Sequence, residues 1–186
     1  VLREAVRLVT GHDALVVGAG VKTGLNIGID DPSQMGADLV AGAVAALDAH
    51  EPPVIIIDMG TATKITAVDE QSTVQGVSIM PGVFISLDAL VNGTSLLKGI
   101  ATNAPVRAIG KNTVESMQSG VVFGAASMLD GMVERFEAEL GPAKTLVATG
   151  GAAGIVVPHC RHSVQYVPTL ILDGLYAVYC RTHAAL

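Results

Sequence analysis

The sequence is poor in the residue types that nucleic-acid-binding proteins need. Aromatic residues make up only 3% of the 186 residues, tryptophan is absent, and no more than two Lys or Arg residues lie close together. A nucleic-acid groove needs a basic stripe and aromatic side chains on which bases stack, whereas the formal net charge here is −6. We therefore expect no nucleic-acid partner.

Long apolar runs are also missing, although half of the residues are hydrophobic and the mean hydropathy is +0.53. A membrane-spanning helix needs about 18 consecutive apolar residues. The longest candidate, Leu39 to Leu47, contains Gly42 and stops at Asp48. Many short runs of Ala, Val, Ile and Leu are instead typical of an α/β core, and we expect no membrane association.

Cysteine is scarce, since Cys160 and Cys180 allow one disulfide at most. The first residues, from Val1 to Glu4, show neither an initiating Met nor the apolar segment of a secretory leader. We therefore predict two reduced thiols, a cytoplasmic protein, and a chain that is a piece of a longer one.

Short apolar runs alternate with helical patterns, which indicates α/β layering. Expected strands lie at 15–17, 54–57, 63–68 and 145–148, with a strand and turn over 76–82. Expected helices lie at 39–47 with Ser33 as the cap, from 81 to about 97, from 113 to 140, and from about 174. Pro52 and Pro53 end the first helix and mark a domain boundary there.

Asp58-Met59-Gly60-Thr61-Ala62-Thr63 joins two expected strands and is the first candidate site. A carboxylate at the end of a buried strand needs a cation or several donors. Successive backbone N–H groups in such a turn form a cavity for anions, and a hard cation prefers oxygen ligands such as Asp58. An ordinary hairpin turn with a local Asx hydrogen bond explains the same residues equally well.

Thr149-Gly150-Gly151 is the second candidate, because paired glycines let a nucleotide approach the backbone. A plain strand-to-helix turn is the alternative. Taken together, the two turns resemble the actin-like ATPase (ribonuclease H-like) α/β fold, whose members hold ATP phosphates between two hairpins, one in each domain.

An ordered set of short motifs carries a more specific resemblance. It comprises Gly20-Val21-Lys22-Thr23-Gly24-Leu25, Gly36-Ala37-Asp38, Asp58 to Thr63, Pro81-Gly82, Gly110-Lys111-Asn112-Thr113, Thr149-Gly150-Gly151 and Gly174-Leu175. Over nearly the whole chain, this set resembles the type III pantothenate kinase family. The resemblance implies a phosphotransferase that uses ATP to phosphorylate the primary hydroxyl of pantothenate, the first step of coenzyme A biosynthesis. It also implies Mg²⁺, a monovalent cation (K⁺ or NH₄⁺) and a homodimer.

Residue by residue, the resemblance implies that Asp38 is the proton acceptor and that Gly36, Ala37, Asp38, Leu39 and Thr113 bind the substrate. It implies that Gly60 and Thr61 bind ATP and that Asp58 binds the monovalent cation. Chemistry is compatible with this role for Asp38, because a helix start keeps a carboxylate ionised and an alcohol needs a positioned acceptor for its proton. An ordinary first-turn helix acid is the alternative for Asp38.

Two departures from the family pattern leave other functions open. No Asp-x-Gly-Asn-Thr hairpin precedes Leu15, so we expect 1–52 to be a remnant of the first domain and 53–186 to be the complete second domain. Leu39 stands where the family has Arg, and Leu cannot bind a carboxylate as an Arg fork does. The alternatives are a non-catalytic regulatory or interaction homologue of the same fold, and a kinase of the same superfamily for another small molecule.

Other polar residues have simpler interpretations. Lys22 and Lys111 are expected to be solvated, and Asn112 is expected to cap the long helix. His159-Cys160-Arg161-His162 lacks a second ligand pair at zinc spacing and is expected to be a polar loop. Asp130 is expected to be a solvated helix acid.

Overall fold

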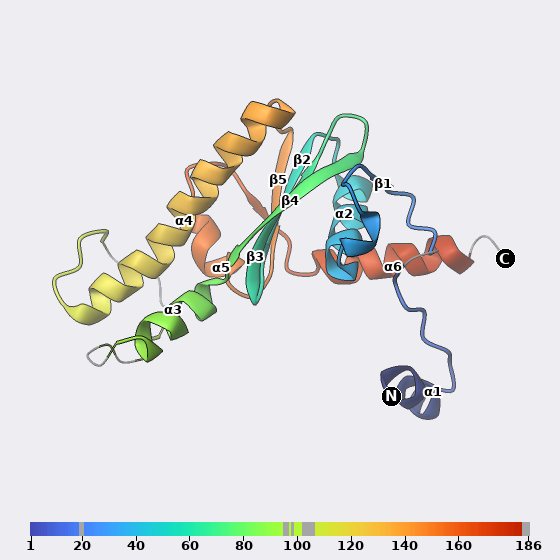
Figure 1. The fold of residues 1–186 in the computed structure, drawn as a ribbon, viewed down its shortest axis with the longest axis horizontal. Coiled ribbons are helices and arrows are strands. Elements are labelled where there is room, and N and C mark those ends of the chain that lie inside the picture. The colour runs from blue at the N-terminus through green and yellow to red at the C-terminus, as the bar shows by residue number, and fades with distance from the viewer. Residues whose placement is uncertain (19–20, 95–96, 98, 102–106, 184–186) are drawn as a thin grey trace.

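The computed structural model describes residues 1–18, 21–94, 97, 99–101 and 107–183 (Figure 1). Within this part of the chain, one mixed sheet has the strand order β1-β4-β3-β2-β5-β6. The strands are β1 (Asn26–Ile27), β2 (Val54–Met59), β3 (Ala62–Val68), β4 (Thr73–Pro81), β5 (Thr145–Thr149) and β6 (Gln165–Tyr166). β3 is antiparallel to β2 and β4, whereas β5 is parallel to both β2 and β6.

Helices cover both faces of the sheet (Figure 1). They are α1 (Leu2–Thr10), α2 (Ala37–Ala49), α3 (Val83–Asn92), α4 (Thr113–Leu140), α5 (Ala153–Val156) and α6 (Leu170–His183), with short 3₁₀ turns at Pro32–Gln34 and Val157–His159. One face carries α2 and α6, and the other carries α3, α4 and α5 (Figure 1). α1 buries no side chain, and no helix of the described residues is long and apolar enough to cross a membrane.

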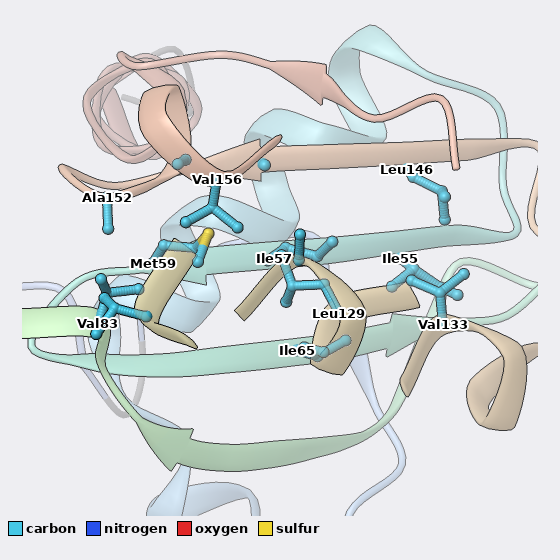
Figure 2. Packing of buried hydrophobic residues seen from close by; sticks show 14 of the residues in the cluster. Ile55, Ile57, Met59, Ile65, Val83, Leu129, Val133, Leu146, Ala152 and Val156 are labelled. Carbon is cyan, nitrogen blue, oxygen red and sulfur yellow. The ribbon is translucent and has the colours of Figure 1, made fainter. Parts of the chain in front are cut away.

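The central strand β2 is buried on both faces, which explains its unbroken apolar run. Side chains alternate along a strand, so Ile55, Ile57 and Met59 enter the core beneath α3, α4 and α5 (Figure 2). Val54 and Ile56 enter the second core, beneath α2 and α6. The two cores fix the sheet between its helical layers and hold the carboxyl ends of β2 and β5 side by side.

The two helices α2 and α6 cross closely because one of them has a glycine at the contact. A Cβ on Gly174 would lie 1.8 Å from the carbonyl oxygen of Ala41, so only glycine fits there. This crossing ties the C-terminal helix to the helix that carries Asp38.

Most expected elements are confirmed, including the β2–β3 hairpin, helices α2 and α4, strand β5 and the cap at Asn112, whose side chain accepts a hydrogen bond from the Glu115 amide. The strand expected at 15–17 is wrong. Leu15 and Val16 are exposed and pair with no strand of the described residues, and a strand needs a hydrogen-bonded neighbour. Ala19 and Gly20 lie outside the described residues.

Three local expectations are also corrected. Ser33 lies in a 3₁₀ turn capped by Asp31, and α2 begins after Gly36 instead. The helix after Gly82 ends at Asn92 and not near Leu97, because Gly93 follows it. Asp130 is not solvated: it is 3% exposed and accepts hydrogen bonds from the Arg161 and His162 amides.

Candidate active site

Three charged side chains meet where α2 begins beside the β2–β3 hairpin. The Lys64 ammonium lies 2.8 Å from the Asp58 carboxylate and also hydrogen-bonds the Asp38 carboxylate. The Lys64 and Asp58 side chains are 17% and 13% exposed, whereas the Asp38 side chain is 43% exposed. One cation thus joins two carboxylates, of which Asp38 is the more open to solvent.

The hairpin register brings Asp58 and Lys64 together. They lie directly opposite each other on β2 and β3, so their side chains share a face of the sheet. Alternation along β2 places Asp58 on the same face as Ile56, which is the face covered by α2. Asp38 lies in the first turn of α2, and the helix start therefore presents its carboxylate to the hairpin.

Charge pairing shifts the pKa values of two of these groups. Partial burial raises the pKa of Asp38, but the Lys64 hydrogen bond and charge outweigh it, together with the Leu39 and Asp38 amides, and the net pKa is lowered. Burial lowers the pKa of Lys64, but the Asp38 and Asp58 carboxylates outweigh it, and the net pKa is raised. Asp38 and Lys64 are therefore charged at neutral pH.

Gly36 shapes the start of α2. A Cβ at this position would lie 2.5 Å from Oδ1 of Asp38, so the absence of a side chain lets the carboxylate turn back over the helix start. Ala37 is exposed beside it and lines a cavity of about 320 Å³ together with Val17, Thr23 and Met35. Leu39 packs against the core under α2.

The glycine-rich turns expected at Gly60 and Gly150 lie against each other at the carboxyl ends of the neighbouring strands β2 and β5. A Cβ on Gly150 would lie 2.5 Å from the Met59 backbone, and the Ala152 amide donates to the Met59 carbonyl. Gly82 packs against the other side of the hairpin turn, where a Cβ would lie 2.2 Å from the Thr61 carbonyl oxygen. The turn is thus held on two sides by glycines.

Hydrogen bonding inside the turn determines which of its groups are available. The Gly60 amide donates to the Ala62 carbonyl and is already used. Thr61 is exposed, and Oδ1 of Asp58 faces Gly60. Thr63 is fully buried, and its hydroxyl has no hydrogen-bond partner in the described part of the chain. A phosphate at this turn would meet the Thr61 hydroxyl rather than the Gly60 amide.

Thr113 is the expected site residue that lies apart from the others. It is the exposed first residue of α4, and α4 covers the face of the sheet opposite α2 (Figure 1). The structure brings four of the expected site residues together at the carboxyl end of β2: Asp38, Asp58, Gly60 and Thr61. Thr113 is not among them.

The donor set at Asp58 does not fit an additional monovalent cation on the oxygen that Lys64 already binds. Two unit charges of the same sign at 4 Å repel by about 4 kcal/mol at an effective dielectric constant of 20. Among the described residues, no group of three His, Cys, Asp or Glu side chains is placed to hold a metal ion.

Lys64 is the residue that the sequence argument missed. The sequence does contain a signal for Lys64: a short turn at Gly60-Thr61 that pairs Met59 with Thr63 places residue 58 opposite residue 64 in the hairpin. Opposite charges at facing positions are a known stabilising pair.

Comparison with solved structures identifies the fold class. A putative Baf family transcriptional activator from Campylobacter jejuni superimposes with a TM-score of 0.63 at 20% identity, covering 89% of this chain and 72% of that one. An activator of 2-hydroxyisocaproyl-CoA dehydratase from Clostridium difficile, with bound ADPNP, superimposes with a TM-score of 0.51 at 14% identity, covering 84% and 71%. The chain has the actin-like ATPase fold, as its sequence motifs predicted.

Sequence comparison then identifies the family. The type III pantothenate kinase family profile matches residues 1–135. The type III pantothenate kinase of Moorella thermoacetica is 39% identical over 181 residues, covering 97% of this chain and 71% of that protein. This chain belongs to the type III pantothenate kinase family.

Proposed function

We propose that this protein transfers the γ-phosphoryl group of ATP to the primary hydroxyl of pantothenate. Family membership supports the reaction class. The observation that carries the proposal is the meeting of Asp38 and Asp58 on the Lys64 ammonium, beside the exposed Thr61 turn. This arrangement places a proton acceptor and a phosphate-binding turn side by side at the carboxyl end of β2.

Asp38 acts on the alcohol. The hydroxyl of the substrate donates its hydrogen bond to the Asp38 carboxylate, and the hydroxyl oxygen then attacks the γ-phosphorus while the bond to ADP breaks. The lowered pKa of Asp38 makes it a weak base, so its main contribution is to orient the hydroxyl, and it takes the proton as the new bond forms.

The phosphates of ATP bind at the hairpin turn, which contains Gly60 and Thr61 and follows Asp58. The Thr61 hydroxyl donates to a phosphate oxygen, and Gly60 lets that oxygen approach the turn closely. Mg²⁺ would be held mainly by the phosphate oxygens of ATP, and Asp58 would contact it only through a water on Oδ1, which faces Gly60, because Lys64 contacts Oδ2. When bound, Mg²⁺ neutralises charge on the phosphates of ATP.

Substrate binding involves Gly36 to Leu39 and Thr113. Ala37, the residue before Asp38, lines the cavity of about 320 Å³, which is space for the body of pantothenate. Thr113 begins α4, which covers the face of the sheet opposite α2 (Figure 1), and the Thr113 that contacts the substrate therefore belongs, in this proposal, to a second copy of the chain. A homodimer is therefore part of the proposal.

The test measures pantothenate-dependent release of ADP. The protein expressed from its complete gene is assayed with ATP, MgCl₂ and KCl, with and without pantothenate, and the phosphorylated product is identified by mass spectrometry. We expect ADP release only when pantothenate is present. Absence of pantothenate-dependent release from a folded protein that binds ATP would refute the proposed reaction.

Leu39 favours a second candidate, a non-catalytic homologue that binds nucleotide without transferring phosphate. Leu39 is half-buried against the core and supplies no charge to a substrate carboxylate. This candidate predicts ATP binding without turnover on pantothenate or on a panel of other small alcohols, and no gain of turnover in Leu39→Arg. Turnover on a different alcohol would instead identify a kinase for another substrate.

A further inference from the structure

We propose that the ammonium group of Lys64 replaces the monovalent cation expected at Asp58, so that phosphoryl transfer needs neither K⁺ nor NH₄⁺. The inference rests on the proposed function, because it concerns the cation requirement of that reaction. It arises from a disagreement between the expected ion site and the side chains that are present there.

The position of the ammonium group is the first argument. The Lys64 ammonium lies 2.8 Å from Oδ2 of Asp58, which is direct contact with the carboxylate expected to bind the ion. A lysine ammonium carries the same single charge as K⁺ or NH₄⁺ and has three N–H donors. Contact with Asp38 uses a second donor, so this one group reaches both carboxylates.

Local charge is the second argument. Asp38 and Asp58 are two carboxylates that contact the same ammonium group, and like charges in one site repel each other unless a cation lies between them. Lys64 is their cationic partner in the described part of the chain. An added cation on the same Asp58 oxygen would be repelled by Lys64, so the tethered charge and a bound K⁺ compete for one place.

The attachment of the charge is the third argument. The hairpin register fixes Lys64 opposite Asp58, and the lysine side chain is only 17% exposed. A covalently attached partner has a high effective concentration that does not depend on the salt in solution. The site therefore keeps its cation when the K⁺ concentration changes.

The first experiment compares salts with the unaltered protein. ADP release is measured with pantothenate, ATP and MgCl₂ in KCl, NH₄Cl, NaCl or choline chloride at equal ionic strength. We expect rates within about twofold of one another, since a difference of that size corresponds to only a small change in activation free energy. A rate at least about tenfold higher in KCl than in choline chloride would overturn the inference.

The second experiment removes the tethered charge. Lys64→Ala opens space beside Asp58, and we expect its activity to fall in choline chloride and to rise at least about tenfold in KCl or NH₄Cl. Lys144→Ala is the matched control, because Lys144 is an exposed lysine paired with Glu51. It should show no salt preference. A folded Lys64→Ala variant that gains nothing from K⁺ or NH₄⁺ would overturn the inference.

Thermal unfolding provides a readout that does not need turnover. We expect equal Tm values for the unaltered protein in KCl and choline chloride, and a Tm for Lys64→Ala that is about 3 °C higher in KCl. A K⁺-specific rise in Tm of the unaltered protein would contradict the inference. If Lys64→Ala does not fold, this comparison of Tm values still tests whether Lys64 replaces the monovalent cation. Absence of pantothenate-dependent ADP release in every salt would refute the proposed function, and the Tm comparison would still test Lys64.

Discussion

Gly82 links the fold to the candidate phosphate turn, and Gly82→Ala tests that link. Gly82 is buried at the start of α3, with backbone angles of −69° and 159° that alanine adopts without strain. A new Cβ would lie 2.2 Å from the Thr61 carbonyl oxygen and 2.7 Å from that of Gly60. The substitution therefore acts through contact with the turn and not through the backbone conformation of residue 82.

The size of the effect follows from these distances. Ordinary contact begins at 3.4 Å, so the turn or α3 must retreat by about 1 Å, and overpacking of this kind costs about 1–3 kcal/mol. For a chain of this length, Tm falls by about 2–4 °C for each kcal/mol lost. A displacement of about 1 Å at a reacting centre can reduce the rate about 100-fold.

The assay combines thermal unfolding with calorimetric titration of ATP. We expect Gly82→Ala to lower Tm by about 2–12 °C and to weaken ATP binding. Gly120→Ala is the matched control: it lies within α4, no atom would lie within 4 Å of its new Cβ, and the exchange should stabilise the helix by about 0.5–1 kcal/mol. A Gly82→Ala protein with unchanged Tm and unchanged ATP affinity would refute the close packing of α3 on the turn.

Three further predictions follow from the charged groups. Asp38→Asn should abolish phosphoryl transfer and leave ATP binding unchanged, as measured by ADP release and calorimetry; persistent turnover would reduce Asp38 to a helix-start acid. Asp130→Ala should lower the free energy of unfolding by about 2–3 kcal/mol in urea titrations, because the Arg161 and His162 amides lose their acceptor; no loss would contradict that role. The lowered pKa of Asp38 and the raised pKa of Lys64 should stabilise the fold between pH 3.8 and 10.5, with stability lost as pH falls through the Asp38 pKa or rises through the Lys64 pKa. Unfolding of Asp38→Asn across pH checks this, since its deficit relative to the unaltered protein should shrink below pH 3.8; a deficit that does not change with pH would contradict it.

Strand and helix positions were largely predictable because they depend on local patterns. The run from Val54 to Ile57 is apolar without interruption, as a strand buried on both faces must be. The apolar spacing after Asn112 predicted α4, and Asn112 caps it. Leu15 to Val17 has the same local character as a strand, but a strand also needs a neighbour, which no local pattern supplies. The division into 1–52 and 53–186 stays a prediction.

Asp130 shows why burial of an acid was not predictable. A single acid on a long helix has the sequence signature of a solvated residue. Its burial depends on a loop about 30 residues further along the chain, whose amides at Arg161 and His162 turn toward the carboxylate. The burial of Asp130 therefore depends on the packing of that loop against α4.

The sequence alone determined the glycine-bearing turns and the acids beside them, because close backbone approach and strand ends impose those residue types locally. The tertiary structure alone decided that Lys64 joins Asp38 and Asp58. A register shift of one residue in the hairpin would turn Lys64 to the other face of the sheet. Asp38 reaches it from 26 residues away only because α2 packs on that face. Pairing of charges distant in sequence depends on register and helix packing, which the burial of the whole core sets.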